Sequence, residues 1–542
     1  MNKRIIAIGI LGMFLLTSFT TISAVEIKTT ATGNTIYVDD DFDSSTPGWQ
    51  VTHFDKIQDG INAAVEDDKV YVYIGTYSEH IIVDNSITLE GEHRDTTVIE
   101  GTVEINANQV NMSKFTVGNI NTNKLADGIC IKGSYNTVKN NMIKEISCEK
   151  ETYGICVEEG SHNNLINNDI TAISSLFWAG GISFGGSHHK VLGNTITNIN
   201  SDEGNNIVGI DFSGNYNTIE GNTITNIHSY GADSFGIAAR ETYSNIITGN
   251  TIKDITGKGI AAGIFLEDSN NHNTITRNTI KNIESSIFLA VGIYFTGSFN
   301  NVKENRIINI DGYSVAYGIC GFYGYVPEDN NTIEGNTITD VQCVLIGVCG
   351  GISLNHDVDS TIKGNTVTDI ARNNMGTECR GGLILSSCLN VTIEENIIKN
   401  IINIVGYGIW LGGSTDTLIT HNDIYVGGEE RSATFNFQHC IDDGEFDETK
   451  ISSNTWYQNY WNKPRYSPKT ITGKLVIVDR SGGVVDVITK YNEDPDPLLK
   501  PYNGNKAVSS PQLLQLPLLL NQRLQQLRPL LRLQLLIRLL YQ

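Results

Sequence analysis

The chain is 542 residues long and carries a formal net charge of −22, although only 18% of its residues are charged. A protein this acidic lacks the electrostatic attraction on which nucleic-acid binding depends, so we expect no nucleic-acid partner. A polyanionic polysaccharide would also be repelled, unless Ca²⁺, which prefers oxygen ligands, bridged it to surface carboxylates.

The amino terminus has the pattern of a signal peptide over residues 1–24. Lys3 and Arg4 precede an apolar run from Ile5 to Leu16, and small or hydroxylated residues follow up to Ala24. The apolar run is short for a membrane span, so we expect cleavage near Ala24, with an uncleaved anchor as the alternative. The pattern predicts a secreted or cell-surface protein.

Residues 35–120 are predicted to form an N-terminal cap and the first coils of a repeat. Within them, Phe54 to Ala64 reads FDKIQDGINAA, an amphipathic helix pattern that we expect to close one end of the apolar core. Short segments with alternating apolar side chains follow, as in VYVYIG and SITLEGE. This alternation predicts strands rather than further helices.

Residues 121–427 contain a repeat with two markers in each unit. A Gly that is usually followed by Ile recurs in steps of 26 to 33 residues, at Gly128, Gly154, Gly181, Gly209, Gly236, Gly263, Gly292, Gly318, Gly351, Gly382 and Gly408. An Asn-x-Ile signature recurs at Asn141, Asn168, Asn194, Asn222, Asn250, Asn278, Asn305, Asn336, Asn396 and Asn422, and at Asn365 with Val367 in place of Ile. Each unit holds three short apolar segments. The repeat therefore predicts an all-β solenoid, a right-handed parallel β-helix with three short strands per coil and about 11 to 13 coils.

The alternation along the first strand of each unit assigns its side chains to two faces. The first and third positions after the repeated Gly are apolar, as in Ile264 and Leu266, and are predicted to face inward. The second and fourth positions, as in Phe265 and Glu267, are predicted to face outward. The repeated Asn is expected to form a ladder in which each amide bonds to the Asn of the next coil.

Repeats such as Tyr216 to Ile227 (YNTIEGNTITNI) resemble those of NosD-type and related pectate-lyase-like β-helix proteins, a carbohydrate-associated superfamily. The resemblance covers residues 35–465, with a terminal coil at 428–465, and it implies a polysaccharide or a cell-envelope glycan as partner. The chain lacks both the GFxARD-like segment of pectin methylesterases and the Asn-Thr-Asp, Asp-Asp and Gly-His-Gly set of polygalacturonases. No catalytic residue of either enzyme carries over.

Two further segments follow the predicted β-helix. Residues 466–505 are predicted to be a small β appendix, in which Ile471 to Val487 has the pattern of a hairpin around Asp479 to Gly483. Residues 506–542 are a low-complexity tail of mostly Leu, Gln and Arg. This tail is consistent with a frameshifted reading frame, a disordered segment or a membrane-binding helix, and a membrane contact is expected only there or at an uncleaved signal peptide.

One outward group combines charges of both signs. Asp211, Arg240, Glu267 and Asp268 fall on three successive coils, with Arg240 and Glu267 expected as stacked neighbours. As a catalytic set, Arg would neutralise a uronate carboxylate while the acidic residues act as acid and base or bind Ca²⁺. The alternative is a solvated ion pair between adjacent coils.

A second outward group is aromatic and comprises Phe265, Tyr294, Phe322 and Trp410. Sugars stack on aromatic faces, so an exposed row of rings predicts carbohydrate binding, while cover by neighbouring loops is the alternative.

The cysteines and histidines do not predict a metal site. The chain has nine cysteines, an odd number, and no disulfide framework is expected. Cys130 and Cys156 share an outward column on successive coils, so they are either a disulfide across the ladder or a pair of stacked thiols. His188 and His189 lack a third ligand at metal spacing and are expected to be solvated turn residues.

These observations favour a secreted or cell-surface β-helix protein that binds carbohydrate or associates with the envelope, without catalysis and without an established cofactor. One alternative is a polysaccharide lyase, hydrolase or epimerase that acts on the outward face. A second alternative is a NosD-like periplasmic maturation factor, which rests on the resemblance alone. The oligomeric state is not predicted.

Overall fold

The structure is a computed structural model that describes residues 33–201, 205–268, 270–322, 330–344, 347–370, 381–401, 407–426, 433–440, 454–461, 469–478 and 484–498. The chain divides into two compact units, Met1–Tyr502 and Asn503–Gln542, and every described residue belongs to the first. The predicted signal peptide, the turn of the predicted hairpin and the tail at 506–542 lie outside the described residues. No described helix is long and apolar enough to cross a membrane.

The strands form three sheets, named sheets A, B and C here. Sheet A has 17 strands: β1 (Thr35–Val38), β2 (His53–Phe54), β3 (Lys69–Val72), β6 (Thr88–Gly91), β9 (Asn111–Ser113), β12 (Thr137–Lys139), β15 (Asn164–Ile166), β18 (Lys190–Leu192), β21 (Thr218–Glu220), β24 (Ile246–Thr248), β27 (Thr274–Thr276), β30 (Asn301–Lys303), β33 (Thr332–Glu334), β36 (Thr361–Lys363), β39 (Thr392–Glu394), β42 (Leu418–Thr420) and β45 (Thr455–Tyr457).

Sheet B has 15 strands: β4 (Gly75–Tyr77), β7 (Thr97–Glu100), β10 (Thr116–Thr122), β13 (Met142–Cys148), β16 (Asp169–Ser175), β19 (Thr195–Ser201), β22 (Thr223–Ser229), β25 (Thr251–Gly257), β28 (Thr279–Ser285), β31 (Arg306–Gly312), β34 (Thr337–Cys343), β37 (Thr366–Ile370), β40 (Ile397–Ile401), β43 (Asp423–Val426) and β46 (Tyr460–Trp461).

Sheet C has 16 strands: β5 (Ile81–Val83), β8 (Val103–Ile105), β11 (Ile129–Ile131), β14 (Thr152–Val157), β17 (Ala179–Phe184), β20 (Ile207–Asn215), β23 (Ser234–Tyr243), β26 (Ile260–Glu267), β29 (Leu289–Phe295), β32 (Val315–Phe322), β35 (Val348–Asn355), β38 (Gly381–Ser386), β41 (Tyr407–Gly412), β44 (Ala433–Cys440), β47 (Lys469–Val478) and β48 (Val484–Asp494).

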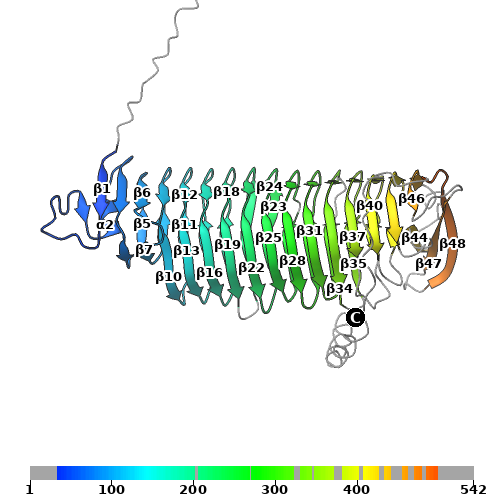
Figure 1. The fold of residues 1–542 in the computed structure, drawn as a ribbon, viewed down its shortest axis with the longest axis horizontal. Coiled ribbons are helices and arrows are strands. Elements are labelled where there is room, and N and C mark those ends of the chain that lie inside the picture. Colours follow the sequence, from blue (N-terminus) through cyan, green and yellow to red (C-terminus); the bar gives the residue numbers. More distant parts are fainter. Residues whose placement is uncertain are drawn as a thin grey trace, which may run out of the picture. The chain divides into compact units, whose positions relative to one another are not determined.

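Each coil contributes one strand to each sheet, and each strand pairs in parallel with its equivalent one coil away, as β23 does with β26. The first unit is therefore a right-handed parallel β-helix of about 12 turns, as predicted. Figure 1 shows the equivalent strands lying side by side in chain order. The last pair, β47 and β48, is antiparallel and confirms the predicted hairpin.

The described helix, α2 (Ile57–Ala63), lies at the N-terminal end of the stack, where the sequence predicts a cap. Ile57 is fully buried and Ile61 is 2% exposed. The helix packs against β1, β3 and β5, so its apolar side covers the first coils as expected.

The interior is built from stacked columns of equivalent residues, apolar in the strands and Asn in the ladder. The predicted inward positions are buried throughout, and Ile264 and Leu266 are 0% exposed. The predicted Asn ladder is present: the side-chain Nδ2 of Asn250 donates to Asn278 Oδ1 at 3.0 Å, and its Oδ1 accepts from Asn222 Nδ2 at 2.9 Å. Each buried amide is thus satisfied by its neighbours, which offsets the cost of burying it.

The prediction for the two histidines is wrong for His189. His188 is exposed and stacks between His162 and Tyr216, with ring centroids 4.7 and 5.2 Å apart. His189 is only 1% exposed and takes the place of an Asn in a second ladder, where its Nδ1 accepts the backbone N–H of Asn163 at 3.2 Å. At this position of the ladder a ring nitrogen accepts the hydrogen bond that an Asn side-chain oxygen accepts in other coils. The residue type alone does not predict this role for a histidine.

The cysteines are mostly unpaired in the described part of the chain. Cys130 and Cys156 are free thiols. A disulfide joins Cys343, at the end of β34, to Cys349 in β35.

Candidate functional site

The outer face of sheet C is wider than the sequence suggests, because the repeated Gly bends each strand. A Cβ added to Gly263 would point inward and lie 2.5 Å from Ile280 Cγ2, although the next residue, Ile264, also faces inward. Two successive positions therefore turn inward, and the residues on either side of them, Ala262 and Phe265, turn outward. Each strand thus presents two neighbouring outward side chains instead of one.

These two columns form a second hydrophobic cluster outside the coil. Its buried members are Tyr153, Val208, Phe235, Ala238, Ala262, Phe265, Val291 and Cys320. The expected exposed row of aromatic rings is interrupted as a result, since Phe265 is only 7% exposed. The residue before each repeated Gly helps to cover the aromatic rings, a contact that was not predicted from the sequence.

The aromatic rings on this face stack from strand to strand. The ring centroid of Phe265 lies 4.8 Å from that of Phe235 and 4.6 Å from that of Tyr294, and the planes of Phe265 and Tyr294 differ by 15°. Tyr294 is partly exposed. Phe322, on the next strand, is 43% exposed, whereas Trp410 lies on β41, three strands beyond β32, and is not part of the stack.

The charged group lies beside this stack. Arg240 and Glu267 are in register on β23 and β26, as predicted, and Arg240 Nε lies 3.7 Å from Glu267 Oε2. Their side chains are 60% and 43% exposed, so the ion pair itself adds little stability. Asp268 is an exposed turn residue with a φ of 64°, and its carbonyl accepts the N–H of Glu241.

Tyr294 connects the two predicted groups. Burial raises the pKa of its phenol, and Cys320, Glu267 and Asp268 raise it further by charge. Both carboxylates thus lie within electrostatic reach of the ring. We call Arg240, Phe265, Glu267, Asp268 and Tyr294 the Tyr294 patch.

Asp211 has different surroundings. It lies on β20, in register with Ala238 on β23, the strand that also carries Arg240. Burial raises the pKa of Asp211 to about 6, although the charge of Arg240 lowers it. Glu151 raises the pKa of Asp211 as well, and Glu151 Oε1 accepts a hydrogen bond from the Tyr153 hydroxyl at 2.9 Å. Asp211 is therefore still mostly ionised at neutral pH, but it takes up a proton at a higher pH than an ordinary aspartate does.

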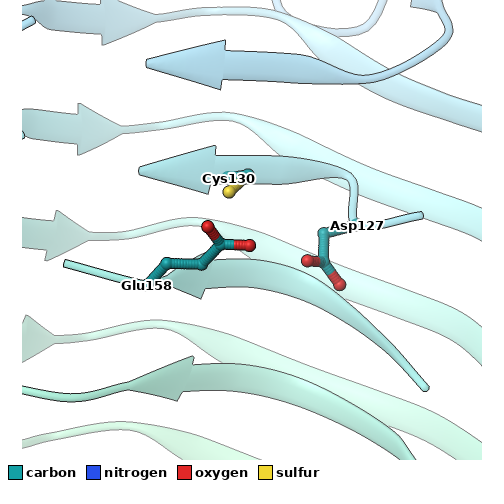
Figure 2. Close-up of side chains that lie close together, drawn as sticks. All are labelled: Asp127, Cys130 and Glu158. Carbon is teal, nitrogen blue, oxygen red and sulfur yellow. The ribbon is translucent and has the colours of Figure 1, made fainter. Parts of the chain in front are cut away.

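A third group, on β11 and β14, mixes thiols with carboxylates (Figure 2). One ligand atom each from Asp127, Cys130 and Glu158 lies within 4.8 Å of the others. Cys130 is in register with Cys156. Glu158 and Asp127 both act electrostatically on the two thiols and add to the raised pKa of each.

Burial dominates the protonation of this group. It raises the pKa of Asp127 to about 6 and that of Cys130 to about 12, and it also raises the pKa of the Cys156 thiol. The Asp127 carboxylate accepts the backbone N–H of Tyr153 at 2.7 Å, which partly offsets the shift. The sequence predicted that the two cysteines are neighbours, but not that Asp127 and Glu158 join them. Asp127 stands immediately before Gly128, and Glu158 stands four residues after Gly154.

Another acidic group, Asp39, Asp40 and Asp41, follows β1 and offers only oxygen ligands. Burial is the main cause of the raised pKa of Asp39. These carboxylates have the chemistry that Ca²⁺ prefers, but they are largely exposed to water.

Comparison with known proteins supports the fold. The family model described as "Right handed beta helix region" matches residues 173–324. It does not distinguish NosD-type proteins from other β-helices. No curated protein matches the chain at a significant level.

Similar solved structures include the Dettilon tailspike protein, with 14% identity and a TM-score of 0.41 over 82% of this chain and 72% of that one. A PL6 alginate lyase complexed with a trisaccharide has 11% identity and a TM-score of 0.36 over 88% and 95% of the two chains. Pectate lyase Pel9A has 14% identity and a TM-score of 0.32 over 57% and 77%.

Proposed function

We propose that this chain is an exported β-helix protein that binds a neutral glycan at the Tyr294 patch without catalysing a reaction. The observation that carries the proposal is the partly exposed Tyr294 ring, which stacks on buried Phe265 beside the carboxylates of Glu267 and Asp268. A ring supplies a face for the C–H side of a sugar, and carboxylates accept bonds from its hydroxyl groups.

The two faces of the Tyr294 ring are covered to different degrees. Phe265 covers one face of the ring at 4.6 Å, and the residue in register on the other side is Cys320, whose side chain is too small to cover a phenol ring. Because Phe265 is itself buried, it holds Tyr294 in place. A rigid, partly exposed ring loses little conformational entropy when a ligand binds.

The charges of this face favour a neutral glycan over a uronate polymer. Two cations of this face are already paired, since Lys132 Nζ lies 2.8 Å from Glu104 Oε1 and Arg240 Nε lies 3.7 Å from Glu267 Oε2. The carboxylates of Asp127, Glu158, Asp211 and Asp268 add negative charge to the same face. An anionic polymer would be repelled unless a cation such as Ca²⁺ bridged the two.

One observation favours catalysis as a second candidate function. Asp211, with a pKa of about 6 and Arg240 nearby, could act as a general acid near neutral pH. However, Asp211 and Glu267 are two strands apart in sheet C, which separates their backbones by about 9 to 10 Å along the stack alone. Glycosidase carboxyl pairs lie about 5 to 9.5 Å apart. A lyase or epimerase reaction with Arg240 on a uronate is therefore the better-supported form of this alternative.

The test is to measure binding of the purified full chain to neutral and acidic polysaccharides, with and without Ca²⁺. Tyr294→Ala should weaken binding of a neutral glycan by about 10- to 100-fold, as expected for the loss of one stacked ring. The matched control is Tyr216→Ala, which removes a tyrosine that is 52% exposed on another edge of the coil. That variant should bind like the wild-type protein.

Equal binding by the wild-type protein and the Tyr294→Ala variant, with unchanged circular dichroism, would contradict the proposal. New reducing ends, or unsaturated uronate absorbance, that disappear in both Arg240→Ala and Asp211→Asn would establish the catalytic alternative instead.

A further inference from the structure

We propose that Asp127, Cys130, Cys156 and Glu158 form a binding site for one divalent metal ion of the Zn²⁺ type. The site lies on β11 and β14, whereas the Tyr294 patch lies on β23, β26 and β29. β17 and β20 separate the two groups in sheet C, so the metal site is independent of the proposed glycan binding.

The backbone brings three of the four side chains together and places the fourth, Cys156, beside Cys130 on the next strand. Asp127 and Cys130 flank the inward pair at Gly128, so both face outward on one strand. Cys156 occupies the register position of Cys130 on the next strand, and Glu158 follows two residues later on the same face. Figure 2 shows Asp127, Cys130 and Glu158 lying together on these neighbouring strands, with their ligand atoms within 4.8 Å of one another.

The side chains of the group lie close enough to act on one another, since the carboxylates of Glu158 and Asp127 both act electrostatically on the thiols of Cys130 and Cys156. A metal ion placed between them would form coordinate bonds to thiolates and carboxylates. The two thiol protons would pass to solvent, because thiolates rather than thiols bind metal.

The charge balance also favours a cation. Among the described residues, no Lys or Arg makes an ion pair with Asp127. Lys132 Nζ lies 3.9 Å from Glu158 Oε2 but 2.8 Å from Glu104 Oε1, so Glu104 is its closer partner. A divalent ion would therefore meet Asp127, which has no cationic partner among the described residues, and Glu158, whose cation Lys132 lies closer to Glu104.

The mixture of ligands selects the metal. Two sulfur and two oxygen ligands suit a borderline ion such as Zn²⁺, which takes four ligands in a tetrahedron. Ca²⁺ and Mg²⁺ prefer oxygen ligands alone and would not use the thiols. The set also differs from Asp39, Asp40 and Asp41, which contains no sulfur.

A disulfide between Cys130 and Cys156 is the competing state. Neighbouring parallel strands place their Cα atoms about 4.8 Å apart, at the short end of the range for disulfides. The structure has both cysteines as free thiols. The two states exclude each other, because a disulfide has no thiolate to offer a metal.

The experiment uses the reduced, metal-free full chain titrated with Co²⁺, followed by competition with Zn²⁺. We expect one equivalent of Co²⁺ to give a thiolate-to-metal charge-transfer band and the visible bands of tetrahedral cobalt, both removed by Zn²⁺. Cys130→Ser and Asp127→Asn should each weaken Zn²⁺ binding by about 100-fold or more, since even indirect contacts to a metal ligand are worth about 10- to 100-fold. Glu158→Gln, at a more exposed position, provides a variant with less risk to folding.

The matched control is Cys320→Ser, which removes a free thiol from the same outward column outside the cluster. It should bind Co²⁺ like the wild-type protein. The proposal is overturned if the charge-transfer band survives in the Cys130→Ser, Cys156→Ser double variant, or if Asp127→Asn and Glu158→Gln both bind Zn²⁺ as tightly as the wild type. It is also overturned if peptide mapping of the protein as isolated finds Cys130 linked to Cys156 and the reduced protein binds no metal.

Discussion

The interior of the coils and the outer face of sheet C obey different rules. Inside, Asn222, Asn250 and Asn278 occupy the same position on successive coils and bond to one another. Outside, one column runs through Asp211, Ala238, Phe265, Tyr294 and Cys320 without repeating a residue type. An interior residue must pack against the equivalent residues of the two neighbouring coils. An outward residue need only be compatible with the extended backbone of a strand. Residue chemistry therefore varies much more on the outer face than in the interior ladder.

The largest difference between interior and outward positions is expected when one member of the Asn ladder is removed. Asn250→Ala should lower the free energy of unfolding by about 3 to 5 kcal/mol, because it leaves buried hydrogen-bonding groups without partners and opens a small cavity. Four hydrogen bonds are lost. Asn250 Oδ1 accepts from the N–H and the Nδ2 of Asn222, both at 2.9 Å. Asn250 Nδ2 donates to the carbonyl of Ile219 at 2.9 Å and to Asn278 Oδ1 at 3.0 Å. Urea unfolding followed by circular dichroism measures the change.

The control for this variant is an outward Asn. Asn226 is exposed, has a φ of 57° and donates to Asn198 Oδ1 at 3.2 Å. Asn226→Gly keeps a residue that accepts this backbone angle and should change the free energy of unfolding by no more than about 0.5 kcal/mol. If the two substitutions cost the same, the ladder does not stabilise the interior in the way described.

The next largest effect is expected at the repeated Gly. A Cβ at Gly263 would lie 2.5 Å from Ile280 Cγ2 and 2.7 Å from the carbonyl oxygen of Gly292. Gly263→Ala should therefore cost about 2 to 3 kcal/mol, the usual range for overpacking a core, measured by the same unfolding experiment.

Gly185→Ala is the matched control on the outside of the coil. A Cβ there would meet only Ser213 Oγ, at 3.5 Å, which is an ordinary contact. Its effect should stay within about 0.5 kcal/mol, and an equal loss at both positions would show that steric conflict is not the reason for the repeated Gly.

The same rule explains how far the sequence alone could lead. The interior positions recur at regular spacing in the sequence. This spacing predicted the fold, the cap at Ile57–Ala63 and the register of Arg240 with Glu267. These features depend on spacing, and spacing is visible in a sequence.

The exposure of the outer face was not predictable in this way. Strict alternation assigns only the second and fourth positions after each Gly to the outer face of the strand. The inward turn at the Gly adds the residue before it, so Phe235 lies beside Phe265. The same bend brings Asp127 to Cys130 and Glu158. A bend adds contacts that no period in the sequence reveals, and both candidate sites depend on such contacts.

His189 is an exception within an interior ladder and provides the smallest of the expected effects. Its Nδ1 accepts the N–H of Asn163 at 3.2 Å, so its proton sits on Nε2, which donates to the carbonyl of Gly185 at 2.9 Å. Burial lowers the pKa of the imidazole from its ordinary value of 6.5, and the charge of His162 acts in the same direction. The folded protein therefore keeps this ring neutral at a pH where the unfolded chain binds a proton.

This linkage fixes the sign of a pH dependence. The stability that neutral His189 contributes is fully present above pH 6.5 and is lost as the pH falls through that value, since only the unfolded state gains a proton at first. His189→Asn restores the residue type of the column and has no titrating group. At pH 8 the free energies of unfolding of the two proteins should differ by no more than about 1 kcal/mol, the size of one buried hydrogen bond. At pH 5 the variant should have become more stable relative to the wild type.

Asp127 and Asp211 titrate in both proteins, so the difference in unfolding free energy between the two proteins isolates His189. A gap that stays constant from pH 8 to pH 5 would mean that the imidazole is protonated equally in the folded and unfolded states, and that the ladder accepts a charged ring.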